Sequence, residues 1–350
     1  MHDSDRGTSS GTDTGTGPDA GGGRDHGTDG GTGRTMRAIS PDGWGGPEVL
    51  RVVTLARPAP GPTEILVRVH AAGVNPVDWK TRATGGFGMH GEPPVLGYDV
   101  SGVVEAVGPG VTVLRPGDEV FGMPEFPRQA GGYAEYVTGP ARHFVPKPPQ
   151  LSHVEAAALP LAGLTAYQSL VETAGLASGQ RVLVHAAAGG VGHLAVQIAA
   201  ARGAYVIGTA REEKHALLTE LGADELIDYT RQDFTAVLGN QAVDVVLDSI
   251  GGEYGHRSLQ VLRDGGTLVT LPSPDDVPAP EETEPRGIRT GFTLVEPDST
   301  GLRALASLVA EGRLRPVVDT VLPLERAADA HRLGENGRTR GKIVLTVADV

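Results

Sequence analysis

The chain has 350 residues, no cysteine and a formal net charge of −13. The acidic balance disfavours nucleic acid and anionic membranes as partners, and the lack of cysteine excludes disulfides, catalytic thiols and zinc–thiolate sites. No apolar run approaches the roughly 20 residues that cross a bilayer and no hydrophobic signal region opens the chain, so we expect a soluble, cytoplasmic protein without a membrane partner.

Residues 1–35 form a low-complexity tract of Gly, Thr, Asp and Ser that contains no leucine, isoleucine, valine or aromatic residue. Such a segment has no apolar surface to bury, so we expect a disordered tail. From Met36 to about Pro148, short β-branched segments alternate with Gly and Pro turns. This pattern predicts a barrel-like β domain, with strands at 64–74, 100–111, 115–123 and 131–139.

A helical stretch at 153–176, interrupted near Pro160, separates this β-rich part from a regular alternation of apolar strands and amphipathic helices. Such alternation predicts a parallel sheet with helices on both faces. We expect its strands at 181–185, 204–210, 225–229, 243–251 and 266–272. The Pro- and Glu-rich segment 273–290 is expected to be an exposed loop. After a last helix at 301–312, two terminal strands should return to the first domain.

The sequence HAAAGGVGHLAVQIAA (185–200) places three glycines between the first strand and the first helix of this alternation. The N–H groups at the start of a helix are unpaired and favour an anion. Gly189 and Gly190 would let the backbone approach a pyrophosphate, and Gly192 would let helix and strand pack tightly. The turn is a variant of the dinucleotide-binding motif, with Ala187 at its first glycine position. A glycine-rich turn that serves packing alone is the alternative.

The end of the second strand indicates which nucleotide is preferred. NAD-binding folds place a carboxylate there for the ribose hydroxyls, whereas this strand ends at Thr209 and Ala210, followed by Arg211. Arg211 and Lys214 could pair with a 2′-phosphate, or they could be solvated residues at the start of a helix. This favours NADP(H) over NAD(H).

Together these segments resemble the medium-chain dehydrogenase/reductase superfamily, in its zinc-free, ζ-crystallin-like quinone oxidoreductase branch. The resemblance covers residues 36–350 and rests on motifs in the family's order: AAGVNPVDWK (71–80), LGYDVSGVVEAVG (96–108), RPGDEVFG (115–122), GGYAEY (131–136), AALPLAGLTAY (157–167), AAAGGVG (186–192), LGADELIDY (221–229) and VLDSIGG (246–252).

The resemblance implies an α/β protein in which a GroES-like, β-rich catalytic domain is interrupted by a Rossmann-type parallel α/β dinucleotide-binding domain. The expected boundaries are 36–154 for the first part of the catalytic domain, 155–295 for the NADP(H)-binding domain and 296–350 for the return. The resemblance also implies a homodimer joined through the nucleotide domains.

Several residues match family positions that contact NADPH. Thr165 matches the threonine beside the nicotinamide, and Gly189, Gly190 and Val191 match the pyrophosphate turn. Thr209 and Arg211, at the end of the second strand, are also expected to contact the cofactor. The remaining matches are Lys214 and Tyr229 at the 2′-phosphate, and Ser249 and Ile250 at the nicotinamide riboside.

Three departures from zinc-dependent relatives concern the metal. Asn75 stands where those enzymes have cysteine, Tyr98–Asp99 stands where they have His–Glu, and the four-cysteine structural zinc loop has no counterpart. We therefore expect no metal. In many quinone oxidoreductases a tyrosine occupies the position of Lys80, so the identity of a proton donor stays open.

Without a zinc Lewis acid, reduction of an activated C=C bond asks less of the protein than reduction of a ketone. We expect NADPH-dependent reduction of a quinone, enone or enoyl substrate. Asn75 would donate to the carbonyl oxygen or cap the next helix, Lys80 would donate a proton or stay exposed, and Tyr98 would donate into the cleft or cover the core. The alternatives are an enoyl reductase of polyketide or fatty-acid metabolism and a non-catalytic NADPH-binding protein.

Overall fold

The computed structural model describes residues 34–88 and 90–347 of the chain. The expected disordered tail, 1–35, lies outside these residues except for its last two positions. Thr35 is already the first residue of strand β1 (Thr35–Pro41), which pairs antiparallel with β2 (Leu50–Ala56). This hairpin was not predicted from the sequence.

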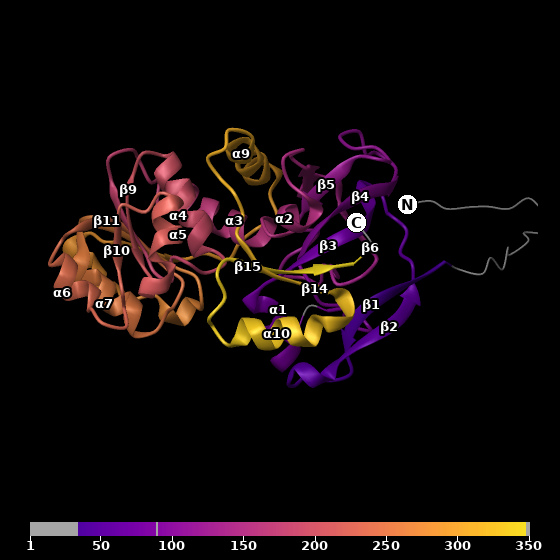
Figure 1. Ribbon diagram of the computed structural model, residues 1–350, viewed down its shortest axis with the longest axis horizontal. Helices are drawn as coiled ribbons and strands as arrows, with labels where there is room; N and C mark the ends of the chain where they lie inside the picture. Colours follow the sequence, from indigo (N-terminus) through magenta and orange to yellow (C-terminus); the bar gives the residue numbers. More distant parts are fainter. Residues whose placement is uncertain (1–33, 89, 348–350) are drawn as a thin grey trace, which may run out of the picture. The chain divides into compact units, whose positions relative to one another are not determined.

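A seven-stranded, mostly antiparallel sheet forms the β-rich part of the molecule (Figure 1). Its strands follow the order β14-β15-β3-β4-β5-β7, and β6 also pairs with β3. Ile65, Val67 and Val69 of β3 are fully buried at alternate positions, as expected for a strand with one face on a core. The strands are β3 (Glu64–Val74), β4 (Asp99–Val107), β5 (Glu119–Gly122), β6 (Tyr136–Pro140), β7 (Phe144–Pro146), β14 (Val318–Pro323) and β15 (Lys342–Thr346).

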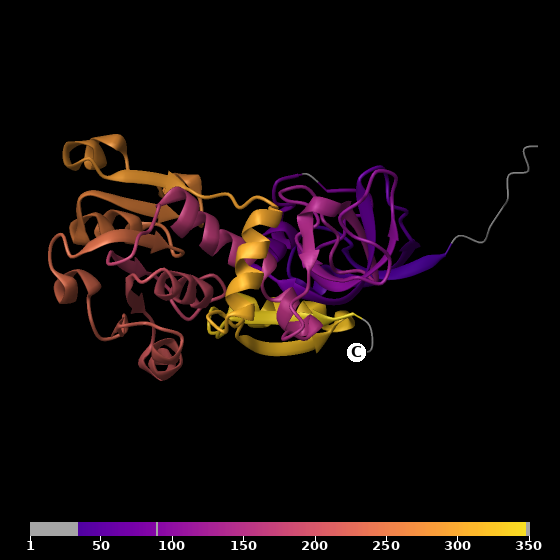
Figure 2. The same ribbon diagram turned by 90° about the horizontal axis from the view of Figure 1, so that it is seen from above.

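The chain's last strands complete this sheet. β15 pairs antiparallel with β3, with Leu345 opposite Ala72, and parallel with β14. In both ribbon views β15 runs beside the strands of the N-terminal part (Figures 1 and 2). The terminal strands therefore return to the first sheet as expected, where β3 gives β15 a second hydrogen-bonding partner beside β14.

The second sheet has six parallel strands in the order β10-β9-β8-β11-β12-β13. Numbered along the chain, this is the order 3-2-1-4-5-6 of a Rossmann-type sheet. The predicted α/β fold class is confirmed. The strands are β8 (Arg181–Val184), β9 (Tyr205–Thr209), β10 (Glu225–Ile227), β11 (Val243–Asp248), β12 (Leu262–Thr270) and β13 (Arg289–Phe292).

Helices cover both faces of the parallel sheet. Val182 and Val184 face one hydrophobic cluster, which α3, α4, α5 and α9 complete, whereas Leu183 faces another, completed by α6 and α7. Buried strands of this kind carry apolar side chains on both faces. The helices are α3 (Pro160–Tyr167), α4 (Gly192–Ala201), α5 (His215–Glu220), α6 (Phe234–Leu238), α7 (Glu253–Val261) and α9 (Ser299–Ala310).

The segment 273–290 differs from the predicted exposed loop. It contains the short helix α8 (Pro280–Thr283), buries Ile288, and leads into β13, which pairs parallel with β12. The three remaining α-helices are α1 (Pro76–Thr84), α2 (His153–Ala157) and α10 (Ala327–Glu335), of which α10 was not predicted. A π-helical turn follows α3 directly.

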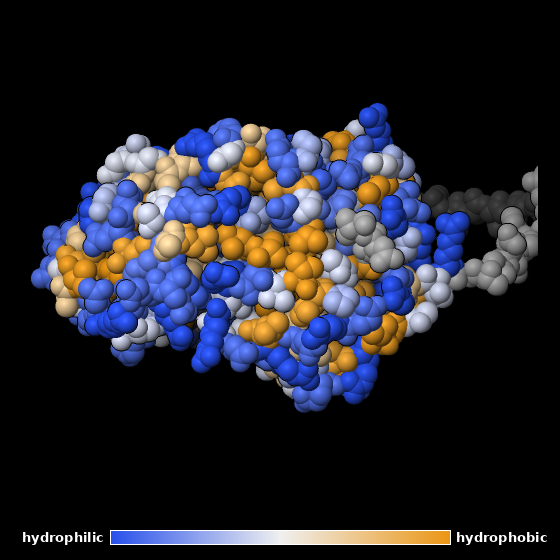
Figure 3. All heavy atoms as spheres, viewed as in Figure 1, coloured by the Kyte–Doolittle hydropathy of each residue, from blue (hydrophilic) through white to orange (hydrophobic). Residues whose placement is uncertain are grey.

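On the face shown in Figure 3, apolar residues gather in a band at the level of β15, with polar residues on both sides of it. In the part of the chain that the structure describes, no helix is both long enough and apolar enough to span a bilayer.

Candidate cofactor and substrate site

The glycine turn connects β8 to α4 and packs tightly on itself. A Cβ atom at Gly192 would lie 2.4 Å from the carbonyl oxygen of Ala186 and 2.8 Å from the Cα atom of Ala187. Real Cβ atoms do not approach backbone so closely, so only glycine fits at this position. This close approach lies within the turn that follows β8, so the packing of helix against strand at Gly192 stays an expectation.

The same turn exposes backbone donors at the start of a ten-residue helix. Among the described residues, the N–H groups of Gly190 and Val191 have no acceptor. The turn itself is held by the end of the neighbouring strand, because Ala186 N donates to Thr209 Oγ1 (3.2 Å) and Ala187 N donates to the Thr209 carbonyl (3.0 Å). Thr209 therefore fixes the turn through two hydrogen bonds. The N–H groups of Gly190 and Val191 stay free and suit an anion.

Two buried histidines brace this turn. His193 Nδ1 bonds the Gly189 carbonyl (2.8 Å), and its Nε2 accepts from Val317 N (3.1 Å). His185 contacts Ser258 Oγ through Nε2 (3.0 Å). Burial lowers the pKa of His193 to about 4 and that of His185 to about 3, so both rings are neutral at pH 7. Both act as structural histidines.

The carboxyl ends of β8 and β11 meet beside the turn, where the strand order of the sheet reverses. Ser249 Oγ donates to the His185 carbonyl (2.9 Å) and joins the two strand ends. Asp248 Oδ1 accepts from the N–H groups of Ile250 (2.9 Å) and Gly251 (3.1 Å), and the Ile250 side chain is 41% exposed. Such a reversal point is where open α/β sheets bind ligands.

The predicted 2′-phosphate residues follow β9 and β10. Arg211 Nε donates to Tyr229 Oη (3.1 Å), and both side chains are accessible. Lys214 Nζ instead donates to the carbonyls of Arg338 (3.1 Å) and Thr339 (3.2 Å). The structure thus pairs Tyr229 with Arg211 rather than with Lys214, and it brings the segment before β15 to the same cluster. Sequence reasoning did not include this segment.

Thr165 lies on α3 and is buried, with Oγ1 donating to the Leu161 carbonyl one turn earlier (2.7 Å). The N–H group of Leu161, in the first turn of α3, donates to Asp99 Oδ1 (2.7 Å). Through Asp99, the helix that carries Thr165 is tied to the β-rich part of the molecule.

Asn75 is the N-cap residue of α1, and its side chain is almost fully buried. Its Nδ2 donates to Asp99 Oδ2 (2.8 Å), and its Oδ1 accepts from Lys342 Nζ. Its backbone N–H donates to Asp78 Oδ2 (2.7 Å). The position is thus the helix cap that the sequence suggested, while the amide itself belongs to a buried polar network.

Lys342 and Asp99 are the members of this network that sequence reasoning did not assign. Lys342 is 3% exposed, and its Nζ also lies 3.3 Å from Asp99 Oδ2. The only sequence signal was a single charged residue at the start of the apolar strand KIVLT. For Asp99, the sequence indicates only that it replaces a glutamate of zinc-dependent relatives.

Asp78 extends the network into the core. Its Oδ2 also accepts from Tyr133 Oη (3.1 Å), while no described residue donates to Oδ1. Burial raises the pKa of Asp78 to about 7, which the hydrogen bond from the Asn75 backbone only partly offsets. Tyr133 Oη in turn lies 3.4 Å from His331 Nε2.

Tyr98 and Lys80 have opposite environments. Tyr98 is 5% exposed and packs edge-on against Phe126, whose ring also contacts Phe87. Burial raises the pKa of Tyr98 to about 12, so the phenol keeps its proton at pH 7. Lys80 is exposed on α1. Tyr98 helps line a small pocket, together with Thr81, Gly85, Phe87, His90, Pro94, Val95, Leu96, Pro127 and Gln129.

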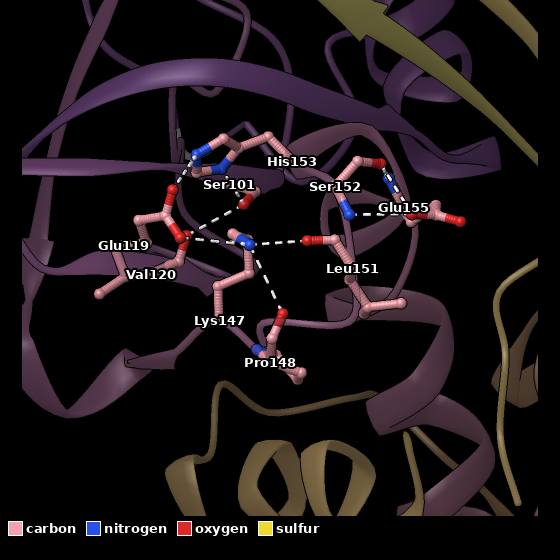
Figure 4. A network of polar contacts seen from close by, with 9 residues as sticks. All are labelled: Ser101, Glu119, Val120, Lys147, Pro148, Leu151, Ser152, His153 and Glu155. Carbon is pink, nitrogen blue, oxygen red and sulfur yellow. Dashed lines mark hydrogen bonds and ion pairs between the residues drawn. The ribbon is translucent and has the colours of Figure 1, made fainter. Parts of the chain in front are cut away.

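A separate polar network joins β4, β5 and the start of α2 (Figure 4). His153 bonds Ser101 Oγ through Nδ1 (2.8 Å) and lies 3.4 Å from Glu119 through Nε2. Lys147, 6% exposed, pairs with the same carboxylate (3.3 Å) and donates to the Leu151 carbonyl (2.6 Å). These residues hold α2 on the sheet, and Ser101 is fully buried.

Two protein families match this chain. Residues 61–149 match the alcohol dehydrogenase GroES-like domain, and residues 221–345 match the zinc-binding dehydrogenase family. The first range covers most of the seven-stranded sheet, and the second includes parts of both sheets.

Individual proteins resemble the chain over most of its length. The 2-methylene-furan-3-one reductase of Solanum lycopersicum is 37% identical over 322 residues, covering 89% of this chain and 79% of that protein. The quinone oxidoreductase of Coxiella burnetii has a TM-score of 0.84 at 38% identity, covering 90% of this chain and all of that one. The quinone oxidoreductase of Escherichia coli, solved in complex with NADPH, has a TM-score of 0.79 at 30% identity, with 90% and 100% covered.

Proposed function

Because the chain belongs to the quinone oxidoreductase branch of the medium-chain dehydrogenase/reductase superfamily, we propose that it is an NADPH-dependent oxidoreductase that reduces a quinone or the C=C bond of an α,β-unsaturated carbonyl compound. The observation that carries the proposal is a direct connection between the glycine turn and the buried network around Asn75. Gly341 N donates to the Ala188 carbonyl of the glycine turn (2.9 Å), and the next residue, Lys342, bonds Asn75. The turn and the candidate substrate residues are therefore neighbours.

The residues at the turn suit NADPH. The unpaired N–H groups of Gly190 and Val191 suit the pyrophosphate, and the cations Arg211 and Lys214 suit a 2′-phosphate. The nicotinamide end would lie toward Thr165, Ser249 and Ile250, by analogy with the family. When bound, the cofactor supplies the hydride.

The chain's own residues would stabilise the negative charge that moves to the substrate's carbonyl oxygen. Tyr98 is a protonated phenol in aromatic surroundings, and among the described residues the second N–H of the Asn75 amide has no acceptor. Donors fixed before the reaction stabilise such charge well in a dry site. Lys80, which solvent reaches, is the candidate that returns a proton to the α-carbon.

We propose that this reaction proceeds without zinc. Residues 75, 98 and 99 stand where zinc-dependent relatives have their ligands, and here Asn75 and Asp99 are both bonded to the ammonium group of Lys342. A buried cation at that point is incompatible with a Zn²⁺ ion, which would need the same oxygen atoms. The residues present therefore do not fit the metal.

We also propose the expected organisation: a catalytic domain at 36–154 and 296–350, an NADP(H)-binding domain at 155–295, and a homodimer joined through the latter. Among the described residues, β13 pairs only with β12, so its outer edge is open. An open edge strand can pair with the same strand of a second copy. Sedimentation analysis of the intact chain should give twice the monomer mass of 36.2 kDa.

The test of the activity is NADPH oxidation by the intact chain with a panel of quinones, enones and enoyl thioesters. Turnover with a quinone or an enone supports the proposal. Turnover with enoyl thioesters alone indicates an enoyl reductase instead. Saturable NADPH binding without turnover on any acceptor would leave the non-catalytic binding protein as the surviving alternative.

A further inference from the structure

We propose that Lys342 is a positioning residue: its ammonium group fixes the orientation of the Asn75 amide relative to the cofactor turn. The inference rests on the proposed function, in which Asn75 faces the substrate. Lys342 lies 267 positions after Asn75 in the chain, and the fold brings the two side chains into direct contact.

The chemistry of the three side chains permits only one orientation of the amide. An ammonium group has only donors, and an ionised carboxylate has only acceptors. Lys342 must therefore meet Oδ1 of Asn75, and Asp99 must meet Nδ2, as the structure shows. A flipped amide would face Lys342 with its NH₂ group and Asp99 with its oxygen, and would lose both contacts. The remaining N–H of Nδ2 is thereby held in one direction.

The backbone of Lys342 is held by Val317, beside the cofactor turn. Gly341 adopts φ of 70°, and a Cβ atom there would lie 2.1 Å from the Val317 carbonyl, so the backbone approaches as only glycine allows. The N–H of Lys342 donates to the same carbonyl (2.8 Å). A Cβ atom at Gly190 would lie 3.3 Å from Lys342 Cδ. The stem of Lys342 thus lies next to Gly190 of the turn, and its ammonium group bonds Asn75.

Burial makes this contact difficult to replace. Lys342 and Asp99 are 3% and 0% exposed, so neither charge has water as an alternative partner. Removing the cation leaves Asp99 uncompensated and leaves the amide held by Asp99 alone, so that its position is less firmly fixed. The expected defect concerns the geometry of Asn75 and not the affinity of the site for NADPH.

Kinetics of matched variants test this inference. We expect Lys342→Met to lower kcat at least about tenfold while the Kd for NADPH changes less than about threefold, because misplacing a donor affects turnover more than binding. Lys342→Arg should restore most of kcat. Combining Lys342→Met with Asn75→Ala should cost no more than Asn75→Ala alone, since both act through one amide. The control Lys147→Met removes another buried, ion-paired cation and should keep kcat.

A readout independent of turnover is available because the chain has three asparagines, Asn75, Asn240 and Asn336. With ¹⁵N-asparagine labelling, the side-chain signals of Asn75 are identified by their loss in Asn75→Asp. They should shift or broaden in Lys342→Met and stay in place in Lys147→Met. If Lys342→Met does not fold, the charge-balanced pair Lys342→Met with Asp99→Asn replaces it.

The outcomes separate the two proposals. Three results would overturn the positioning role. The first is that the Asn75 signals do not move in Lys342→Met. The others are that the losses of kcat in Lys342→Met and Asn75→Ala multiply in the double variant, or that Lys147→Met loses as much kcat as Lys342→Met. A wild-type chain that turns over no acceptor contradicts the proposed activity instead, and the amide signals then still decide what Lys342 does.

Discussion

Arg211, Lys214 and Tyr229 show how much of the site individual residues reveal. Two cations and a phenol after consecutive strands predict an anion site, and the structure does place Arg211 against Tyr229. What the sequence could not predict is that Lys214 is held by the carbonyls of Arg338 and Thr339, more than 120 positions away. These bonds direct the ammonium group before any ligand arrives.

Lys214→Ala should therefore raise the Kd for NADPH about tenfold and leave that for NADH nearly unchanged, since a charge-assisted bond to the extra phosphate is lost. Isothermal titration with both cofactors measures the ratio. Arg231→Ala is the control, because Arg231 is an exposed cation of the next loop that pairs with Glu212. An unaltered NADPH-to-NADH ratio in Lys214→Ala would contradict the assignment.

Asn75 and Lys342 mark the limit of sequence reasoning at this scale. The motif around Asn75 identified the position, and its helix-capping context left two roles open. For Lys342, the sequence shows only a charged residue at the start of an apolar strand. Nothing local in the sequence indicates that the first residue of the last strand lies beside residue 75, because that contact exists only once β15 has paired with β3.

At the scale of elements, the long strand at 64–74 was predicted to the residue, whereas the strands expected at 115–123 and 131–139 are the shorter β5 and β6. The predicted strand at 64–74 is β3. The pattern after the glycine turn predicts a helix over 191–203, and α4 covers all of it except its first residue and its last two. β13 was missed because RTGF has neither alternation nor β-branched runs, and follows a Pro- and Glu-rich segment. Its pairing is decided by the open edge of β12, a tertiary effect that overrides weak local preference.

The glycines of the β8–α4 turn differ in how much the fold depends on them, and we expect those that tolerate a Cβ atom to be the ones that face a ligand. Gly192→Ala should lower the free energy of unfolding by more than about 2 kcal/mol, because its Cβ meets backbone at 2.4 Å. Gly189→Ala, whose Cβ would lie 3.2 Å from the Ala186 carbonyl, should cost much less. Denaturant titration of both variants checks this order, and equal losses would show that the turn has no such division.

For the whole molecule, buried titratable groups set the pH range of stability. Burial lowers the pKa of His153 and His193 to about 4, and that of His185 and His331 to about 3. Each stabilises the fold fully above its unfolded pKa of 6.5, and this stability is lost as pH falls toward the folded value. Asp78, whose pKa is raised to about 7, has the opposite effect between pH 4 and 7.

The four histidines together with Asp78 predict a net uptake of about three protons on unfolding near pH 5. The free energy of unfolding should then fall by about 4 kcal/mol for each pH unit of acidification. Urea unfolding between pH 4.5 and 6.5 measures this slope. His331→Gln should reduce the uptake by about one proton. A free energy of unfolding that is flat across this range would mean that the histidines are not buried as neutral rings.

The central claim is that the N–H groups of the glycine turn, at the reversal point of the parallel sheet, bind a reduced nicotinamide dinucleotide. Calorimetric titration of the intact chain with NADPH and NADH tests it most directly. We predict saturable NADPH binding in the micromolar range, about tenfold or more tighter than NADH. Absence of binding heat from either cofactor at millimolar concentration would contradict the account.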